Sequence, residues 1–289
     1  MCRINRQVQG APWRAVVEQA DSQPVRQARA LMTSLDRANW RLFLPLPKAS
    51  TVLDIGADLG TIAHALADSC HRVIALEPAV ERVEFMHHRF RQEGVRNISV
   101  VRGDVHRLSI RPDSVDLAVL DGVLPWIPWR DVTRPPRQAQ VQALRRIHGV
   151  LRPGGLLCMG IGNRWGLAQF AGTENPHVGL PCVAILPRPL ASLWTRWKTG
   201  LPYRSYTYSV FGYRRLLREA GFAVVQTYCA LPTHRVPHFI FPFDDRLFAH
   251  FARKYDAGRR GPGRAFRQVL RWLRIDKYLV DSFIMVGRK

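Results

Sequence analysis

Four acidic side chains and two glycines stand at the ends of short apolar runs in the first half of the sequence. Their types suit contact with a nucleoside that carries a positive charge. Glycines let the backbone approach a ligand closely, and a carboxylate about 20 residues after such a loop can accept hydrogen bonds from ribose hydroxyls. Several carboxylates around one cleft favour a cationic ligand over a pyrophosphate. These residues are Asp54, Gly56, Gly60, Glu77, Asp104 and Asp121.

These side chains need a scaffold, and the sequence around them alternates between short apolar runs and amphipathic stretches. Strands that alternate with helices of about 10–15 residues are typical of a parallel sheet covered by helices on both faces. Ligands of such sheets bind beyond the carboxyl ends of the strands, where the acidic residues stand. We expect strands at 51–56, 72–78, 97–101, 114–121 and 156–161, and helices at 61–69, 80–92 and 137–151.

Five segments in this order resemble the motifs of class I S-adenosylmethionine-dependent methyltransferases. Residues 52–60 are similar to the first motif, D-x-G-x-G-x-G, and residues 73–78 resemble the ribose-binding segment. Residues 103–105 resemble the adenine-binding segment, 121–124 the strand-four motif, and 150–156 the turn before the fifth strand. The resemblance implies S-adenosyl-L-methionine as the cofactor. It implies cofactor contacts from Asp54, Gly56, Asp58, Gly60, Glu77, Pro78, Asp104, Val105, Asp121 and Gly122.

One residue departs from the pattern, because Asp58 stands where the family usually has its middle glycine. A carboxylate there can contact the amino group of the cofactor or crowd its methionine tail. A dinucleotide site fits the sequence less well. Such a site needs G-x-G-x-x-G, whereas the glycines here are Gly56 and Gly60, with an acid two residues before the first.

The resemblance also implies the fold class, an α/β, Rossmann-like, doubly wound sheet of seven strands that is mostly parallel and has an antiparallel last strand. We expect an N-terminal helical cap over residues 1–48 and a methyltransferase domain over 49–289. Insertions at 163–209 and 231–279 are expected to build the substrate pocket, because long loops at the ligand end of a scaffold commonly carry binding residues. The remaining elements are expected as a helix at 211–222 and strands at 223–229 and 282–288.

Three residues are candidates for a catalytic role. Methyl transfer from a sulfonium is an in-line displacement, so positioning does most of the catalysis. A hydroxyl acceptor also benefits from a base of near-neutral pKa, which His177 or His234 can supply, and Asp121 is the third candidate. Loop histidines that only hold the backbone together are the ordinary alternative.

The first insertion contains the candidates for substrate binding. Asn163 and Arg164 follow the fifth strand, and His177, Tyr206 and Tyr208 lie farther along. Tyrosines can stack on a sugar ring or pack in a core, and the Asn–Arg pair can equally stabilise a turn. An N-R-x-G…H-x-G segment after the fifth strand resembles a bacterial subgroup of envelope-sugar and secondary-metabolite methyltransferases, which implies a saccharide-like acceptor.

Composition excludes several classes of protein. The chain has 289 residues, of which 47% are hydrophobic, too many for a disordered basic tail. No apolar run approaches the roughly 20 residues of a membrane-spanning helix, and the N-terminal residues lack the apolar segment of a secretory signal. Five separated cysteines without a C-x-x-C pair predict neither a disulfide framework nor a metal site. We therefore expect a cytoplasmic protein.

Charge is distributed unevenly along the chain, whose net charge is +21. Residues 51–165 carry 15 basic and 12 acidic side chains, whereas residues 166–289 carry 20 basic and 7 acidic ones. The excess therefore points to an anionic substrate or surface rather than to the cofactor half, although a GC-rich genome also favours arginine. Residues 259–275 form a basic amphipathic pattern that suits the inner membrane surface or a helix packed on the domain.

Two other functions remain open. An RNA methyltransferase is compatible with the basic charge, and so is a non-catalytic RNA- or membrane-binding module on the same fold. Methylation of amino groups on DNA bases fits less well, because residues 121–124 lack the [N/D/S]-P-P-aromatic motif. The acceptor is therefore expected to be a small or lipid-linked molecule rather than nucleic acid.

Overall fold

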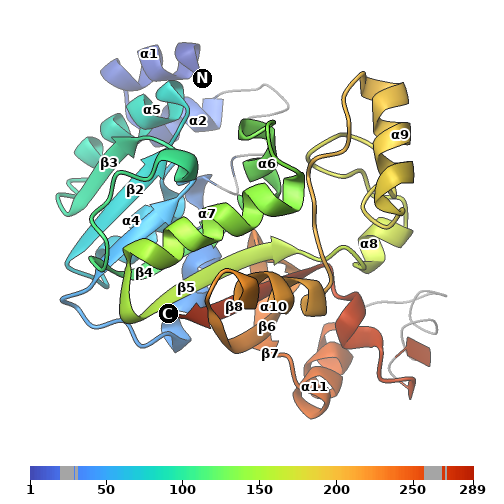
Figure 1. Cartoon of the computed structure of the whole chain (residues 1–289). Coiled ribbons are helices and arrows are strands. Elements are labelled where there is room, and N and C mark those ends of the chain that lie inside the picture. The colour runs from blue at the N-terminus through green and yellow to red at the C-terminus, as the bar shows by residue number, and fades with distance from the viewer. Residues whose placement is uncertain (20–28, 30–31, 257–268, 271) are drawn as a thin grey trace. The chain divides into compact units, whose positions relative to one another are not determined.

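The computed structural model describes residues 1–19, 29, 32–256, 269–270 and 272–289 (Figure 1). Within these ranges, eight strands follow the order β3-β2-β1-β4-β5-β8-β6-β7. The chain divides into two compact units. Unit 1 comprises Met1–Asp121, Arg146–Cys158 and Lys289, and unit 2 comprises Gly122–Arg145 and Met159–Arg288.

Unit 1 contains the strands that the apolar runs predict. β1, β2, β3 and β4 pair in parallel. β1 is buried along almost its whole length because its side chains are apolar apart from Thr51 and Asp54. The elements are α1 Cys2–Gly10, α2 Trp13–Gln19, η1 Leu35–Phe43, β1 Thr51–Ile55, α4 Thr61–Ala67, β2 Arg72–Glu77, α5 Val80–Gln92, β3 Ile98–Arg102, η2 Val105–Arg107 and β4 Val115–Asp121. Two elements pass from one unit into the other, α7 Pro136–Val150 and β5 Leu151–Gly162.

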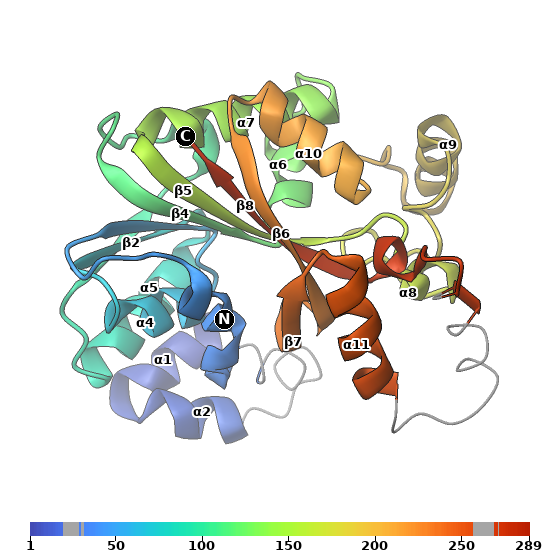
Figure 2. The same ribbon diagram turned by 90° about the horizontal axis from the view of Figure 1, so that it is seen from below.

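The N-terminal helices form an outer layer of unit 1. Figure 2 shows α4 and α5 on one side of the strands of this unit, with α1 and α2 beyond them. Ile4 and Val8 lie one helical turn apart on α1 and are buried in one cluster with Trp13 and Phe85. The segment expected to be helical within 1–48 thus includes α1 and α2, whereas η1 is a 3₁₀-helix.

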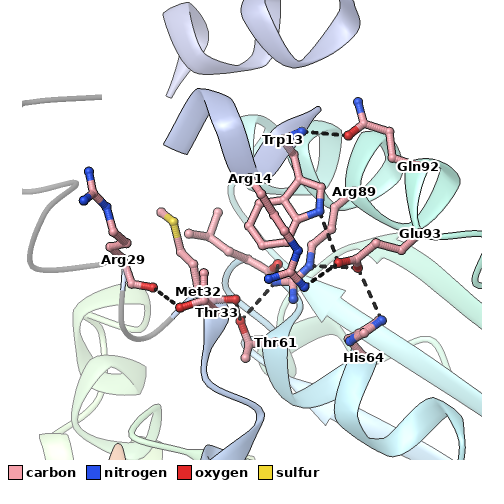
Figure 3. A network of polar contacts seen from close by, with 11 residues as sticks. Trp13, Arg14, Arg29, Met32, Thr33, Thr61, His64, Arg89, Gln92 and Glu93 are labelled. Atoms are coloured by element: carbon pink, nitrogen blue, oxygen red, sulfur yellow. Dashed lines mark hydrogen bonds and ion pairs between the residues drawn. The ribbon is translucent and has the colours of Figure 1, made fainter. Parts of the chain in front are cut away.

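A buried arginine of α5 holds the loop between β1 and α4. Arg89 is completely buried, and its Nη1 donates to the carbonyl of Leu59 at 2.9 Å and to Oγ1 of Thr61 at 3.1 Å (Figure 3). Its guanidinium also lies 4.5 Å from the ring centroid of Trp13, and Nε lies 3.3 Å from Oε2 of Glu93. Buried charges persist where such partners compensate them, so this arginine fixes the loop to α5.

Unit 2 is built on antiparallel strands. β6 pairs with β8 and with β7, both antiparallel. Figure 2 shows α10 and α11 on opposite sides of these strands. The elements are η3 Leu124–Trp126, α6 Ile127–Arg130, α8 Leu167–Phe170, α9 Arg188–Thr199, α10 Val210–Glu219, β6 Ala223–Thr233, β7 Val236–Pro242, α11 Asp245–Asp256, η4 Asp276–Leu279 and β8 Ser282–Arg288.

The Rossmann-like sheet and its antiparallel end are confirmed, but the prediction of seven strands is wrong by one. The additional strand, β7, stands at the end of the strand order. Its sequence contains Pro237 and Pro242, and prolines usually indicate a loop rather than a strand. Proline is accepted on an edge strand because one side of that strand needs no hydrogen-bond donors. β7 therefore uses the position in a sheet that tolerates its composition.

The two expected insertions contain regular structure. Residues 163–209 include α8 and α9, and residues 231–279 include β7, α11 and η4. Most of the basic amphipathic segment 259–275 lies outside the described residues. Within the ranges that the structure covers, no helix combines the length and the apolar character needed to span a membrane.

Candidate active site

The glycine loop keeps its shape although an aspartate replaces the middle glycine. Asp58 adopts φ 55°, between Gly56 at 69° and Gly60 at 79°. Aspartate tolerates this left-handed region better than most residues do. At Gly60, a Cβ would lie 2.5 Å from Cζ of Phe90, so this position requires glycine for packing as well as for conformation. The replacement of the middle glycine by Asp58 thus changes the charge of the loop without changing its left-handed backbone conformation.

Glu77 ends β2 with its carboxylate held in place by backbone groups. Its Oε2 accepts from the backbone N–H of Asp58 at 3.0 Å, and its Oε1 accepts from that of Ala79 at 3.1 Å. Burial raises the pKa of Glu77, while these hydrogen bonds and the guanidinium of Arg82 oppose the rise. Each oxygen retains a second lone pair, so the carboxylate can still accept from the hydroxyls of a ribose.

Arg82 contacts two of the predicted cofactor residues, and the sequence motifs do not reveal it. Its Nη1 lies 3.3 Å from Oδ1 of Asp58 and 3.5 Å from Oε1 of Glu77. The side chain of Arg82 is 46% exposed, so these ion pairs contribute little to stability. They do balance the negative charge that Asp58 adds to the loop.

Asp54 is the buried carboxyl of β1. It is 2% exposed, and among the described residues no donor reaches its buried Oδ2. Burial raises the pKa of Asp54 to about 7, and Arg37 acts in the opposite direction, while Asp121 adds to the rise. A buried oxygen without a donor is a position where a ligand can supply one.

Asp121, at the end of β4, has an arginine partner from the N-terminal cap. Nη2 of Arg37 lies 2.9 Å from Oδ2 of Asp121, with side-chain exposures of 10% and 6%. Arg37 belongs to η1, and it is 84 residues distant in sequence. No local motif could have predicted this contact, so the acidic cluster is less negative than the sequence alone indicates.

Asp104 and Val105 stand between β3 and η2. Oδ1 of Asp104 accepts from the backbone N–H of His106 at 2.5 Å and thereby caps η2. Val105 is buried. The cap fixes the backbone of the segment for which the resemblance implies adenine binding, and this role stays a prediction.

The residues of unit 1 fit the cofactor that the resemblance implies. Asp54 offers an oxygen without a donor, Glu77 offers free lone pairs at the end of β2, and the loop with Asp58 and Gly60 has the backbone that close approach requires. Pro78 follows Glu77 directly. The set suits a nucleoside with a cationic amino-acid tail, because carboxylates dominate and two arginines only partly balance them.

In unit 2, the hairpin tip between β6 and β7 brings both candidate histidines together. Thr233 pairs with Val236, so His234 and Arg235 form the turn. A Cβ on Gly122, which has φ 72°, would lie 3.4 Å from Nε2 of His234 and 3.8 Å from Nε of Arg235. The turn therefore sits against the residue that follows Asp121 in the chain.

His177 lies in the same cluster. Its ring centroid is 4.7 Å from that of Trp126, at 79°. Burial lowers the pKa of His177 to about 4, with further lowering by Arg235 and then by His234. The buried Nδ1 of His177 has no hydrogen-bond partner in the described part of the chain. His177 is therefore neutral at neutral pH and presents a ring nitrogen that a ligand could contact.

Two of the proposed substrate contacts form hydrogen bonds within the protein. Nδ2 of Asn163 donates to the carbonyls of Tyr278 and Val280 at 2.8 and 2.7 Å. Nε of Arg164 donates to the carbonyl of Ala184 at 2.8 Å, and its Nη2 donates to that of Leu186 at 2.8 Å. These contacts anchor the first insertion, and substrate binding by Asn163 and Arg164 stays a prediction.

The two candidate tyrosines surround an arginine. The guanidinium of Arg188 lies 4.0 Å from the ring centroid of Tyr206 and 5.5 Å from that of Tyr208. The hydroxyl of Tyr208 donates to Oε1 of Gln140 at 2.8 Å, and burial raises the pKa of Tyr208. Cation–π contacts of this kind help to hold aromatic rings in place. Stacking on a substrate stays a prediction for both tyrosines.

Comparison with known proteins assigns the domain. Residues 53–159 match the model of a family described as a methyltransferase domain. A 37.1 kDa protein in transposon Tn4556 of Streptomyces fradiae is 40% identical over 105 residues, which are 36% of this chain and 27% of that protein. The match thus spans about a quarter of the relative's length.

Solved structures show the same fold at low sequence identity. An S-adenosylmethionine-dependent methyltransferase from Mesorhizobium loti has a TM-score of 0.52 at 18% identity, covering 90% of this chain and 100% of that one. The [4+2]-cyclase SpnF has a TM-score of 0.53 at 17% identity, covering 100% and 92%. Because the fold also occurs in a cyclase, the reaction has to be argued from the site. Residues 53–159 therefore match a methyltransferase domain, and the solved structures show that its fold is one found in S-adenosylmethionine-dependent methyltransferases.

Proposed function

We propose that the chain is an S-adenosylmethionine-dependent O-methyltransferase whose acceptor is a small or lipid-linked, saccharide-like molecule. One observation carries this proposal. His177 and His234 are far apart in sequence, yet His234 contributes to the lowered pKa of His177, and His234 lies against Gly122. Gly122 is joined by one peptide bond to Asp121, the last residue of the cofactor half.

The residues of unit 1 have separate roles toward the cofactor. Glu77 binds the ribose hydroxyls, Asp104 and the Val105 N–H bind the adenine, and Asp54 receives the cationic end at its buried oxygen. The cofactor, when bound, supplies an activated methyl group on a sulfonium. The buried pair of Arg37 and Asp121 keeps this half of the site fixed before binding, which reduces the reorganisation required.

The histidines have the chemistry that a hydroxyl acceptor requires. An alcohol oxygen becomes a better nucleophile when a neutral imidazole accepts its proton. His177 is neutral at neutral pH, because its pKa is about 4, and its Nδ1 is a buried acceptor or donor without a partner among the described residues. Its low pKa makes it a weaker base than an ordinary histidine. The proposal therefore assigns hydrogen-bonding of the acceptor to His177 and proton acceptance to His234.

Binding of S-adenosylhomocysteine, measured by calorimetry, tests the cofactor half. We expect binding that Glu77→Ala weakens by about tenfold or more, because a buried acceptor for two hydroxyls is lost. Glu81→Ala, in the first turn of α5 and outside the site, is the control. Absence of binding, or binding that Glu77→Ala leaves unchanged, would leave a non-catalytic module as the better account.

Transfer of a labelled methyl group to a panel of acceptors tests the other half. Lipid-linked saccharides and free glycosides form one arm, and total RNA forms the other. His234→Asn is expected to lower turnover on a hydroxyl acceptor while S-adenosylhomocysteine still binds. Labelling of RNA alone would replace the saccharide proposal by RNA methylation, which the basic charge of residues 166–289 also permits.

A further inference from the structure

An exposed apolar stripe runs along α9 in unit 2. Leu190 is 53% exposed, Leu193 is 67% exposed and Trp197 is 76% exposed. We call these three residues the α9 stripe. Leu201, just beyond the helix, continues it with 53% exposure. Figure 1 shows α9 as a separate helix that projects from the strands of its unit.

The α9 stripe lies opposite the face by which the helix is attached. Ala191 and Thr195 are completely buried. At about 100° per residue, Leu190, Leu193 and Trp197 fall within about 60° of one another, on the side away from this buried pair. The face of α9 with Ala191 and Thr195 thus packs against the rest of the unit. The α9 stripe is a second, apolar face that has no partner among the described residues.

Basic side chains flank the α9 stripe. At the same helical spacing, Arg196 falls on one side of it and Lys198 on the other, and both are exposed. Nζ of Lys198 lies 4.3 Å from the ring centroid of Trp197. The sequence from residue 175 to 218 contains no aspartate or glutamate and seven lysines and arginines. The segment around the α9 stripe therefore carries positive charge that no acidic residue of the same segment neutralises.

We propose that the α9 stripe docks on the surface of an anionic phospholipid bilayer. Tryptophan and leucine side chains enter the boundary between headgroups and acyl chains, while arginine and lysine stay at the level of the phosphates. Each cation near such a surface adds attraction that salt screens. The α9 stripe thus matches the boundary of the acyl chains, and its basic flanks match the level of the phosphates.

The charges argue against the other occupants of this face. A second copy of the chain placed against the same stripe would bring Arg196 and Lys198 close to their own counterparts, and like charges repel. RNA would pair with the two cations but would leave the leucines in contact with phosphates. The proposal is independent of methyl transfer, since none of these residues belongs to the cofactor loop or to the histidine cluster.

Flotation of the full chain with vesicles tests the proposal. Vesicles of phosphatidylcholine mixed with phosphatidylglycerol are compared with vesicles of phosphatidylcholine alone, at low and high salt. We expect binding only to the anionic vesicles, weakened by salt. Leu193→Gln/Trp197→Gln should reduce it by about tenfold or more, and Arg196→Gln/Lys198→Gln should remove the preference for phosphatidylglycerol.

A matched control locates the effect on α9. Leu42 is 78% exposed, so Leu42→Gln removes an equally exposed apolar side chain elsewhere. Because all these positions are exposed, circular dichroism should show that the variants stay folded. S-adenosylhomocysteine binding should stay unchanged as well.

Three results would overturn the proposal. The first is a wild-type chain that does not float with anionic vesicles. The second is vesicle binding that Leu193→Gln/Trp197→Gln leaves intact. The third is self-association of the wild-type chain, seen by sedimentation without vesicles and abolished by the same double variant, together with no vesicle binding, which would assign the stripe to a second copy.

Discussion

Arg37 and Asp121 form an ion pair of 2.9 Å that is almost fully withdrawn from solvent. The pair joins η1 to the end of β4, and Arg37 also opposes the rise in the pKa of Asp54. The N-terminal cap therefore contributes a side chain to the cofactor half of the site. A segment expected only to cover the domain is part of the machinery that positions its acids.

Removal of this arginine should destabilise the fold strongly. Arg37→Met withdraws the nearest cation from a buried carboxylate, and breaking one side of such a pair typically costs about 3–5 kcal/mol. We expect this loss in the free energy of unfolding measured with urea. Arg37→Met/Asp121→Asn should recover much of it, because the side chain at position 121 then carries no buried charge without its partner. A double variant as unstable as the single one would show that Arg37 acts through packing instead.

The raised pKa of Asp54 predicts a pH-dependent stability. Because its folded-state pKa is about 7 instead of 3.8, the folded state binds this proton more tightly than the unfolded chain does. Stability should therefore fall as the pH rises from about 4 to about 7 and level off above that, by about 4 kcal/mol in total. Asp54→Asn should flatten this part of the profile in urea unfolding at a series of pH values. An unchanged slope would assign the dependence to other groups.

The buried arginine of α5 should control both stability and cofactor binding. Arg89 holds the carbonyl of Leu59 and the hydroxyl of Thr61, so Arg89→Met leaves two acceptors of the glycine loop unsatisfied, at about 1–3 kcal/mol each. We expect lower stability and weaker binding of S-adenosylhomocysteine by calorimetry. Arg91→Met, at an exposed position of the same helix, should change neither. Equal effects of the two variants would refute a specific role for Arg89.

The strands and the cofactor motifs could be predicted because their signals are local. β1 and β2 are short apolar runs that end in Gly56 and Glu77, and the pattern depends only on neighbours in sequence. Arg37, Arg82 and Arg89 could not be predicted, since each acts on residues that the fold brings to it. The sequence contains many arginines, and nothing in the local pattern separates these from the solvated ones.

The two candidate histidines could be picked out from the sequence, but their proximity could not. Residue type drew attention to His177 and His234, but their proximity depends on the β6–β7 hairpin, and the prolines of β7 made that strand hard to predict. Arg235 was missed for the same reason, because it becomes notable only once the turn places it beside Gly122.

Arg235 should influence His177 through its charge. The guanidinium is the second cause, after burial, of the lowered pKa of His177, so Arg235→Gln should raise that pKa from about 4 toward its ordinary value without reaching it. Titration of the histidine ring signals by NMR, assigned with His177→Asn, measures the shift. Arg246→Gln, at an exposed position of α11, is the control and should leave it unchanged. A pKa of His177 that does not move in Arg235→Gln would show that the two residues do not interact, whereas a rise would show that the hairpin tip adds to the effect of burial on His177.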